Sequence, residues 1–173
     1  DWQLEAVTCE KPEIKLGKYK EEIGKALKTA KIWVPGKETK KEKKTKEEKL
    51  KILSEALLKT VKIDLPLILV EEEVNRSLSK LLEQINKLGL SLDEYLNSIQ
   101  KTVEQLKKEY QEKAEKTLKL EFILEAIADD FKITVEEKEI EQMVPDKEKI
   151  KVNKYYLASV LRRQKTLDKL LNL

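Results

Sequence analysis

Apolar residues recur every three or four positions over most of the chain, which is the spacing of one face of an α-helix. The pattern predicts helices over residues 19–30, 46–61, 66–88, 91–99, 102–131, 134–143 and 153–171. Two residue pairs have the spacing of a capping box, Ser91 with Glu94 and Thr134 with Glu137. Pro66 suits the first turn of one helix, and Gly89 suits the end of the same helix.

The pattern changes along residues 102–131. Up to Ala114 a narrow apolar stripe runs among lysines and glutamates, whereas from Leu118 to Ile127 apolar residues cover most of the circumference. A one-sided stripe suits a helix that is exposed on its other sides, and an all-round apolar helix must be buried. We therefore expect one helix that begins in an arm and ends in a core, with Phe122, Ile123 and Leu124 in that core.

The first nine residues alternate between apolar and polar side chains, which predicts a short strand. A lone strand is not stable in water. We therefore expect its partner to come from residues 32–34 or from sequence outside this chain.

Composition supports an all-α fold and excludes several chemistries. Gly and Pro number only four each, too few for the turns of a β-sandwich or an α/β sheet. The chain has no histidine and one cysteine, Cys9, which excludes histidine-dependent catalysis, an internal disulfide and a zinc site. The glycines are scattered singly, so no phosphate-binding loop is present. We expect no enzyme activity, no catalytic residues, no metal and no cofactor.

Charge is concentrated in one segment. The net charge is +3, from 36 basic and 33 acidic residues, and Lys37 to Lys49, with seven Lys and four Glu, carries the same +3. We interpret this segment as a solvated linker, mobile or weakly helical. Contact with nucleic acid or the ribosome is a second interpretation, which the interleaved glutamates disfavour because they repel phosphate. The pairs Asp129-Asp130 and Arg162-Arg163 are interpreted as solvated helix surface.

The chain offers no membrane segment. Its longest apolar run, Leu65 to Val70, is too short to span a bilayer, and no signal peptide opens the sequence. A single cysteine fits a reducing compartment, so we expect a cytoplasmic protein. The chain begins at Asp1 rather than Met, which suggests that sequence upstream is missing.

Several blocks of sequence resemble bacterial trigger factor. Pro12-Glu13 followed by Leu16-Gly17-Lys18-Tyr19 is similar to that family's junction after its N-terminal domain. The stretch from Ile63 to Val144 resembles the C-terminal domain, and the stretch from Tyr155 to Leu171 resembles its last helix. These blocks occur in the family's order and cover most of the chain.

Two departures from the family limit the resemblance. The Gly-Phe-Arg signature of the ribosome-docking loop is absent, and Ala30 to Lys49 is too short an interval for the prolyl-isomerase domain. The chain therefore resembles a variant without the isomerase domain, here without its ribosome-binding part. Its segments would be a junction over residues 1–30, a charged linker over 31–49 and a helical chaperone domain over 50–173.

The resemblance implies an open helical body with two protruding arms that form a cradle, preceded by a short extended segment. It also implies an ATP-independent holdase that binds unfolded or nascent polypeptides through dispersed apolar patches. Ribosome contact would require a domain absent from this chain, and dimerisation is left open. The alternative is a helical scaffold or assembly protein with one defined protein partner.

Client contacts are expected at large or adaptable apolar residues near helix ends. The candidates are Tyr95, Leu96, Ile99, Met143, Tyr155 and Tyr156.

The short interval from Ala30 to Lys49 leads to a test of catalysis. Catalytic amounts of the chain should not accelerate a refolding reaction that is limited by proline isomerisation. The measurement is the refolding rate with and without the chain, and an acceleration at a low molar ratio would contradict the expectation.

Overall fold

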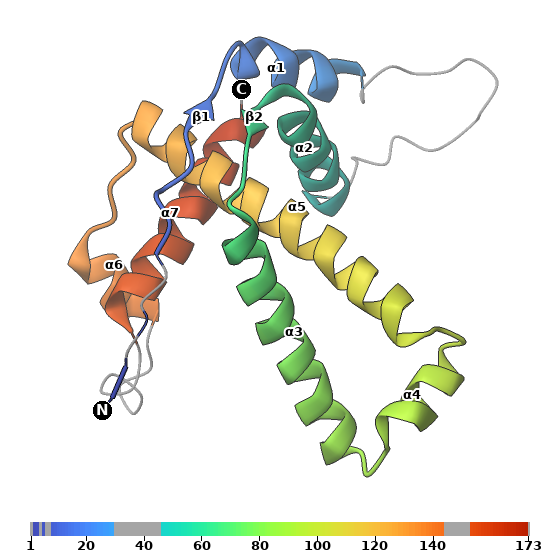
Figure 1. Ribbon diagram of the computed structural model, residues 1–173. Helices are drawn as coiled ribbons and strands as arrows, with labels where there is room; N and C mark the ends of the chain where they lie inside the picture. The colour runs from blue at the N-terminus through green and yellow to red at the C-terminus, as the bar shows by residue number, and fades with distance from the viewer. Residues whose placement is uncertain (1, 4, 6–7, 30–45, 144–152, 173) are drawn as a thin grey trace, which may run out of the picture. The chain divides into compact units, whose positions relative to one another are not determined.

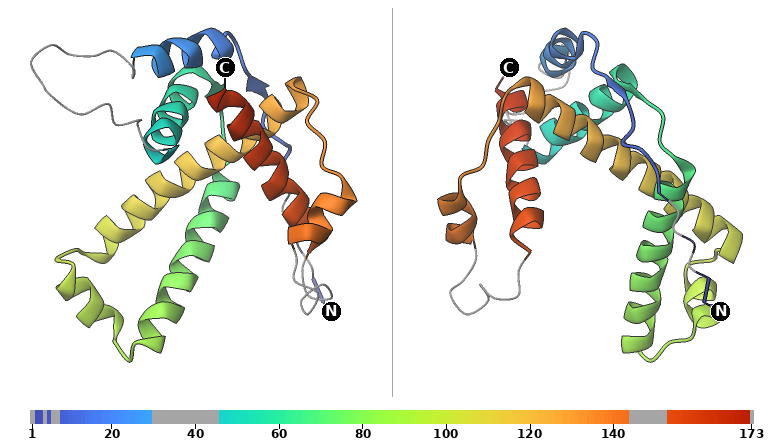
Figure 2. Two further views of the ribbon diagram at one scale, coloured as in Figure 1. Left: turned by 180° about the vertical axis from the view of Figure 1, so that it is seen from behind. Right: turned by 60° about the vertical axis from the view of Figure 1, so that its left-hand side comes forward.

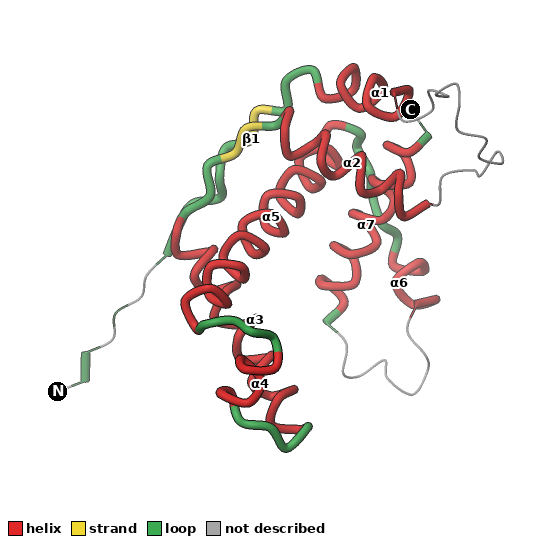
Figure 3. Tube along the Cα trace, turned by 90° about the vertical axis from the view of Figure 1, so that its right-hand side faces the viewer, coloured by secondary structure: helices red, strands yellow, loops and turns green. Residues whose placement is uncertain are grey.

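The computed structural model describes residues 2–3, 5, 8–29, 46–143 and 153–172. The helices in these ranges are α1 (Tyr19–Thr29), α2 (Lys46–Thr60), α3 (Leu67–Lys87), α4 (Leu92–Ser98), α5 (Val103–Asp130), α6 (Glu137–Met143) and α7 (Lys154–Leu171). Two short strands, β1 (Ile14–Lys15) and β2 (Lys62–Ile63), pair with each other. Helix dominates the described chain (Figure 3), so the predicted all-α fold is confirmed.

The predicted strand at the N-terminus is wrong. The described residues among the first nine are not in a strand, and β1 lies further along at Ile14–Lys15. Its partner is β2, whereas the predicted partner at residues 32–34 lies outside the described residues. The physical reason is a lack of burial. An alternating segment forms a stable strand only when its apolar side packs on another apolar surface, and Trp2 is instead 99% exposed.

One predicted capping box is confirmed. The Ser91 hydroxyl accepts from the Glu94 N–H at 3.2 Å, and the Ser91 N–H donates to the Glu94 carboxylate at 2.8 Å. A second box that sequence reasoning missed opens α5, where Thr102 and Gln105 make the same reciprocal pair. Threonine and glutamine three residues apart are a signal that could have identified it.

The other predicted box, Thr134 with Glu137, is wrong. Helix α6 begins at Glu137, so the cap residue is Glu136, whose N–H donates to the Glu139 carboxylate at 2.9 Å. Side chains of α7 fix the preceding chain instead. Lys165 donates to the carbonyl of Thr134 at 3.1 Å, and Thr134 lies in the connection before α6.

The chain divides into two compact units. Unit 1 contains residues 1–13 and 63–119, and unit 2 contains residues 14–62 and 120–173. Helix α5 contributes its first 17 residues, Val103–Lys119, to unit 1 and the remainder to unit 2. The segment boundaries expected from sequence, 1–30, 31–49 and 50–173, stay a prediction. Of the charged segment Lys37 to Lys49, only Lys46 onward is described, and it begins α2.

Unit 1 is built on α3, α4 and the first part of α5, which follow one another along the chain (Figure 1). One core cluster comprises Leu81, Ile85, Leu96 and Leu106, and the other comprises Val70, Val74 and Ala114. Leu78 and Tyr110 pack against both clusters and so join them. The core is therefore a narrow row of side chains from α3 and α5, closed at one end by α4.

Unit 2 buries a larger core. Its most buried side chains are Ile23, Leu53, Leu57, Ile123, Ile127, Thr166 and Leu170. Within this unit α1 packs on α2, and α7 packs beside α2 and α6 (Figure 2). The core prediction holds for Ile123 and Leu124, while Phe122 is half-buried.

Helix α1 is attached to the end of α5 by a group of residues that we call the N-terminal clasp: Tyr19, Lys20, Asp130 and Phe131. The buried Tyr19 hydroxyl donates to the Asp130 carboxylate at 2.7 Å, and the Lys20 ammonium lies 2.8 Å from the same carboxylate. The Tyr19 ring meets the Phe131 ring edge-on at 6.2 Å. Burial and the hydrogen bond to Asp130 raise the pKa of Tyr19, while the hydrogen bonds from Lys20 and Tyr19 lower the pKa of Asp130.

The clasp predicts a stability effect. Tyr19→Phe keeps the buried ring and removes only the hydroxyl donor to Asp130, so the thermal midpoint of unit 2 should fall by a few degrees. Tyr155→Phe is the matched control, because Tyr155 is 89% exposed and should leave the midpoint unchanged. Circular dichroism melts check both variants, and equal midpoints would show that the hydroxyl contributes nothing.

Two helix ends carry a non-glycine residue in the left-handed region, Gln100 after α4 at φ 54° and Lys132 after α5 at φ 51°. Both ends are closed by paired backbone hydrogen bonds, Lys101 N–H to the Leu96 carbonyl and Ile133 N–H to the Ala128 carbonyl among them.

Glycine at these two positions should stabilise the fold. Gln100→Gly and Lys132→Gly should each raise the unfolding free energy by about 0.5–1 kcal/mol, because glycine adopts this conformation without strain. Lys108→Gly, inside α5, should lower it by about 1 kcal/mol. Urea denaturation measures all three, and destabilisation by the first two substitutions would be the contrary result.

Candidate functional site

Three of the six predicted contact residues belong to unit 1 and contribute to its core: Tyr95 and Leu96 lie on α4, and Ile99 directly follows its last residue. Leu96 is only 6% exposed and belongs to the cluster with Leu81 and Leu106. Tyr95 and Ile99 are half-buried and pack against that same cluster. The apolar side of α4 therefore closes one end of the unit 1 core, and Leu96 presents almost no surface to another molecule.

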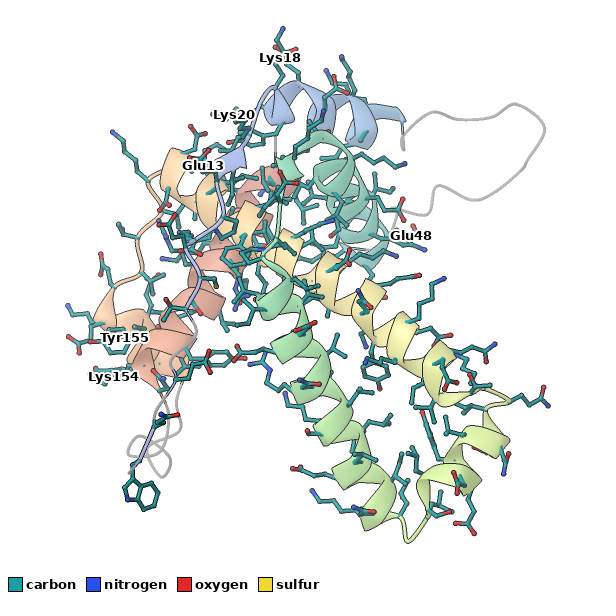
Figure 4. All side chains as sticks on the ribbon, in the orientation of Figure 1. Glu13, Lys18, Lys20, Glu48, Lys154 and Tyr155 are labelled. Carbon is teal, nitrogen blue, oxygen red and sulfur yellow. The ribbon has the colours of Figure 1, made fainter. Side chains whose placement is uncertain are left out.

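The other three lie in unit 2, around the α6 and α7 helices. Tyr155 and Tyr156 are 89% and 62% exposed and occupy the first turn of α7, where Figure 4 labels Lys154 and Tyr155. Asn153 caps this helix, since its side-chain oxygen accepts from both tyrosine N–H groups, at 3.0 and 3.3 Å. Met143 is the last residue of α6, and its side chain lies outside the described part. A role for these six residues in contacts with other chains stays a prediction.

Ion pairs and charged hydrogen bonds hold α6 against α7. Lys154 pairs with Glu137 at 3.1 Å, and Lys165 pairs with Glu139 at 2.6 Å. The hydrogen bond from Lys165, together with the backbone N–H of Glu136, lowers the pKa of Glu139. The exposed tyrosines thus lie in the first turn of a helix that ion pairs hold against α6.

The interpretation of Arg162-Arg163 as merely solvated surface is wrong. Arg162 pairs with Asp129 and also donates to the Ile133 carbonyl at 2.8 Å, while Arg163 pairs with Glu121. Both arginines therefore connect α7 to α5 or to the chain that follows it. The sequence offered no signal for these pairs, because their partners lie about 30 or more positions away.

Sequence reasoning missed a second set of exposed apolar side chains. The set lies in unit 1 and comprises Leu67, Leu82, Leu88, Leu90 and Val103. Leu67 and Leu88, at the two ends of α3, are the most exposed of these, at 63% and 74%. Helical spacing shows which residues share a face, but it does not show whether another helix covers that face.

The described residues hold little that could support catalysis. They contain no group of three or more His, Cys, Asp or Glu side chains placed to bind a metal ion. No buried side-chain nitrogen or oxygen in the described part lacks a hydrogen-bond partner. What this part of the chain offers to another molecule is apolar surface beside polar groups.

No helix among the described residues is both long and apolar enough to cross a membrane.

Comparison with known proteins gives one family. Residues 36–172 match the model of the bacterial trigger factor protein C-terminus. Among individual relatives, trigger factor of Carboxydothermus hydrogenoformans is 36% identical over 80 residues, which cover 46% of this chain and 19% of that protein. Trigger factor of Exiguobacterium sibiricum is 36% identical over 87 residues, covering 50% and 20% respectively.

A longer alignment joins the chain to trigger factor of Caldicellulosiruptor saccharolyticus, at 26% identity over 103 residues, 60% of this chain and 24% of that protein. The chain thus spans about a fifth of the length of the curated relatives it matches. No solved structure matches it.

The lowered pKa of Glu139 predicts an acid-sensitive contact between α6 and α7. A carboxylate with a lowered folded pKa stabilises the fold above its unfolded pKa of about 4.3, and this contribution disappears as the pH falls through the folded pKa. The thermal midpoint should therefore fall more steeply between pH 5 and 3 for the unmodified chain than for Glu139→Gln. Glu141→Gln, an exposed change on the same helix, should keep the steep fall, and identical profiles for all three would refute the assignment.

Proposed function

This chain belongs to the bacterial trigger factor family through the C-terminal region, and on that premise we propose that it is an ATP-independent chaperone of the bacterial cytoplasm. It holds unfolded or nascent polypeptides through dispersed apolar patches and performs no catalytic step. The observation that carries the proposal is the set of large apolar side chains left exposed in both units. Tyr155 and Tyr156 represent unit 2 in this set, and Leu67 and Leu88 represent unit 1.

The binding energy expected from such a surface is small at each patch. Covering apolar surface contributes about 25 cal/mol per Å², and one exposed leucine or tyrosine offers only a small area. Several weak contacts on one client add up when they are engaged together. Binding of this kind has little sequence preference and is readily reversed, as a holdase requires.

The polar surroundings favour reversible binding as well. Charged residues make up 40% of the sequence, so the surface that carries the exposed apolar side chains is rich in solvated charges. Such surroundings keep the free protein in solution and separate the patches from one another. A surface of this kind does not require one partner of fixed shape.

An aggregation assay with two unrelated clients tests the proposal. The chain should suppress the light scattering of both heat-unfolded citrate synthase and reduced insulin at near-stoichiometric ratios, without ATP. A dedicated scaffold or assembly protein would suppress neither, and that result would contradict the proposal.

The exposed tyrosines allow a sharper test. Tyr155→Ser with Tyr156→Ser should raise the amount of chain needed for half-suppression by about three- to tenfold. Helicity and thermal midpoint should stay unchanged, because both side chains are exposed. The control is Lys138→Ser with Gln142→Ser, two exposed changes on α6. If the tyrosine variant protects clients as well as the control does, these tyrosines are not client contacts.

A further inference from the structure

The connection between α5 and α6, residues 131–136, is a non-helical segment that we call the strap. The strap runs beside α7 (Figure 2), and the strap, α6 and α7 all belong to unit 2. Its side chains alternate, because Phe131, Ile133 and Val135 are half-buried whereas the residues between them are exposed. The strap therefore has one apolar side, which is kept partly out of water.

Two ion pairs flank the strap. Arg162 of α7 pairs with Asp129 near the end of α5, and Lys165 of α7 pairs with Glu139 of α6 at 2.6 Å. The four side chains are between 29% and 60% exposed, so solvent reaches both carboxylates. We call these four residues the latch.

The two cations of the latch also hold the backbone of the strap. Arg162 donates to the Ile133 carbonyl at 2.8 Å, and Lys165 donates to the Thr134 carbonyl at 3.1 Å. Each cation thus joins one carbonyl of the strap to one carboxylate beside it. A charged carboxylate attracts its cation more strongly than a neutral carboxyl group does. Loss of the two carboxylate charges would therefore weaken the hold on the strap at both of its ends.

Burial holds the strap less firmly than it holds the core of unit 2. No residue of the strap is fully buried, whereas Ile123, Ile127 and Leu170 have no exposed surface. A segment with few buried contacts opens locally at a lower free energy than a packed core does. The strap is therefore able to open while the helices of unit 2 stay packed.

Further charges surround the first residue of the strap. The ammonium groups of Lys20 on α1 and Lys169 on α7 lie 5.0 and 4.4 Å from the centroid of the Phe131 ring. Asp130 lies beside them and pairs with Lys20 at 2.8 Å. The strap is thus bordered by cations from two helices, and carboxylates balance the charge of these cations.

Acid removes the negative charges of this arrangement and leaves the positive ones. The hydrogen bonds from Lys165 and from the Glu136 N–H lower the pKa of Glu139. The stabilisation from Glu139 is therefore present above the unfolded pKa of about 4.3 and is lost as the pH falls through the folded pKa. The pair of Glu137 with Lys154, which also joins α6 to α7, weakens in the same direction. Lysine and arginine stay charged throughout, so their mutual repulsion then favours opening.

We propose that the strap is an acid-released lid, which opens when the carboxylates of the latch are protonated and adds the apolar side of Phe131, Ile133 and Val135 to the surface that binds unfolded chains. The inference rests on the proposed chaperone function and adds regulation to it. Tyr155 and Arg162 are seven residues apart on α7, which places them on the same side of the helix, about 10 Å apart along its axis. The uncovered surface therefore lies close to an exposed tyrosine.

A variant without the latch carboxylates tests the lid at neutral pH. Asp129→Asn with Glu139→Gln keeps the side-chain shapes and removes both negative charges. Its control, Glu136→Gln with Glu141→Gln, makes the same change in net charge at two exposed positions outside the latch. Glu139→Gln alone leaves the pair of Arg162 with Asp129 in place and replaces the double variant if circular dichroism shows that the double variant has lost helicity.

The opening is measured by amide hydrogen exchange and mass spectrometry. At pH 7 residues 131–139 should exchange about tenfold faster in the latch variant than in its control, whereas residues 120–127 stay protected in both. At pH 3 the unmodified chain should show the same acceleration after correction for the intrinsic pH dependence of exchange. The proposal is overturned by equal exchange of the strap in variant and control, by an unchanged strap at pH 3, or by loss of protection in both segments together.

An aggregation assay at pH 7 separates the lid from the function. The latch variant should suppress the light scattering of reduced insulin at about half the molar ratio that the control needs, because more apolar surface is available. If the strap opens and both chains suppress equally, the lid does not regulate binding and this proposal is overturned, while the chaperone proposal stands. If no form of the chain suppresses scattering, the proposed function fails and its regulation fails with it, although hydrogen exchange still shows whether the strap opens.

Discussion

The constraint on which the structure depends is that one helix, α5, must satisfy two different environments. Its first 17 residues belong to unit 1 and bury a narrow stripe that includes Leu106 and Ala114. Its remaining residues belong to unit 2 and bury Ile123, Leu124, Ile127 and Ala128 within two turns. A rotation of the helix about its axis would expose one of these two sets of apolar side chains. The apolar pattern of α5 therefore fixes which side of each half is buried. Both cores are organised around this change of pattern.

Polar contacts hold α1 and the connection between α5 and α6 in place. The N-terminal clasp attaches α1 to the end of α5, where the Asp130 carboxylate accepts from Tyr19 and pairs with Lys20. Cationic side chains of α7 hold the connection between α5 and α6 by donating to backbone carbonyls as well as to carboxylates. Hydrogen bonds from charged donors are stronger than neutral ones, so a few of them can fix a connection that has little apolar surface.

The narrow core of unit 1 explains why this part of the chain offers surface for binding. A single row of side chains joins α3 to α5, and the described residues leave apolar side chains such as Leu67 and Leu88 largely exposed. In unit 2 the tyrosines at the start of α7 are exposed for a different reason, since the cap at Asn153 requires only their backbone N–H groups. Membership of the trigger factor family and this exposed apolar surface support the same proposal, reversible binding of unfolded chains.

The sequence alone determined the helical class, six of the seven helix starts to within two residues, and the change of pattern along α5, because these follow from local spacing and capping. The tertiary structure decided which apolar faces are covered. Leu96, predicted as a contact, is buried because α4 closes the core of unit 1, whereas the described residues leave Leu67, at the start of α3, 63% exposed. It also decided the start of α6, where the Glu139 carboxylate accepts from the Glu136 N–H and from Lys165 of α7 in place of the expected pair of Thr134 with Glu137. Such outcomes depend on partners about 30 positions away, and a local pattern carries no information about them.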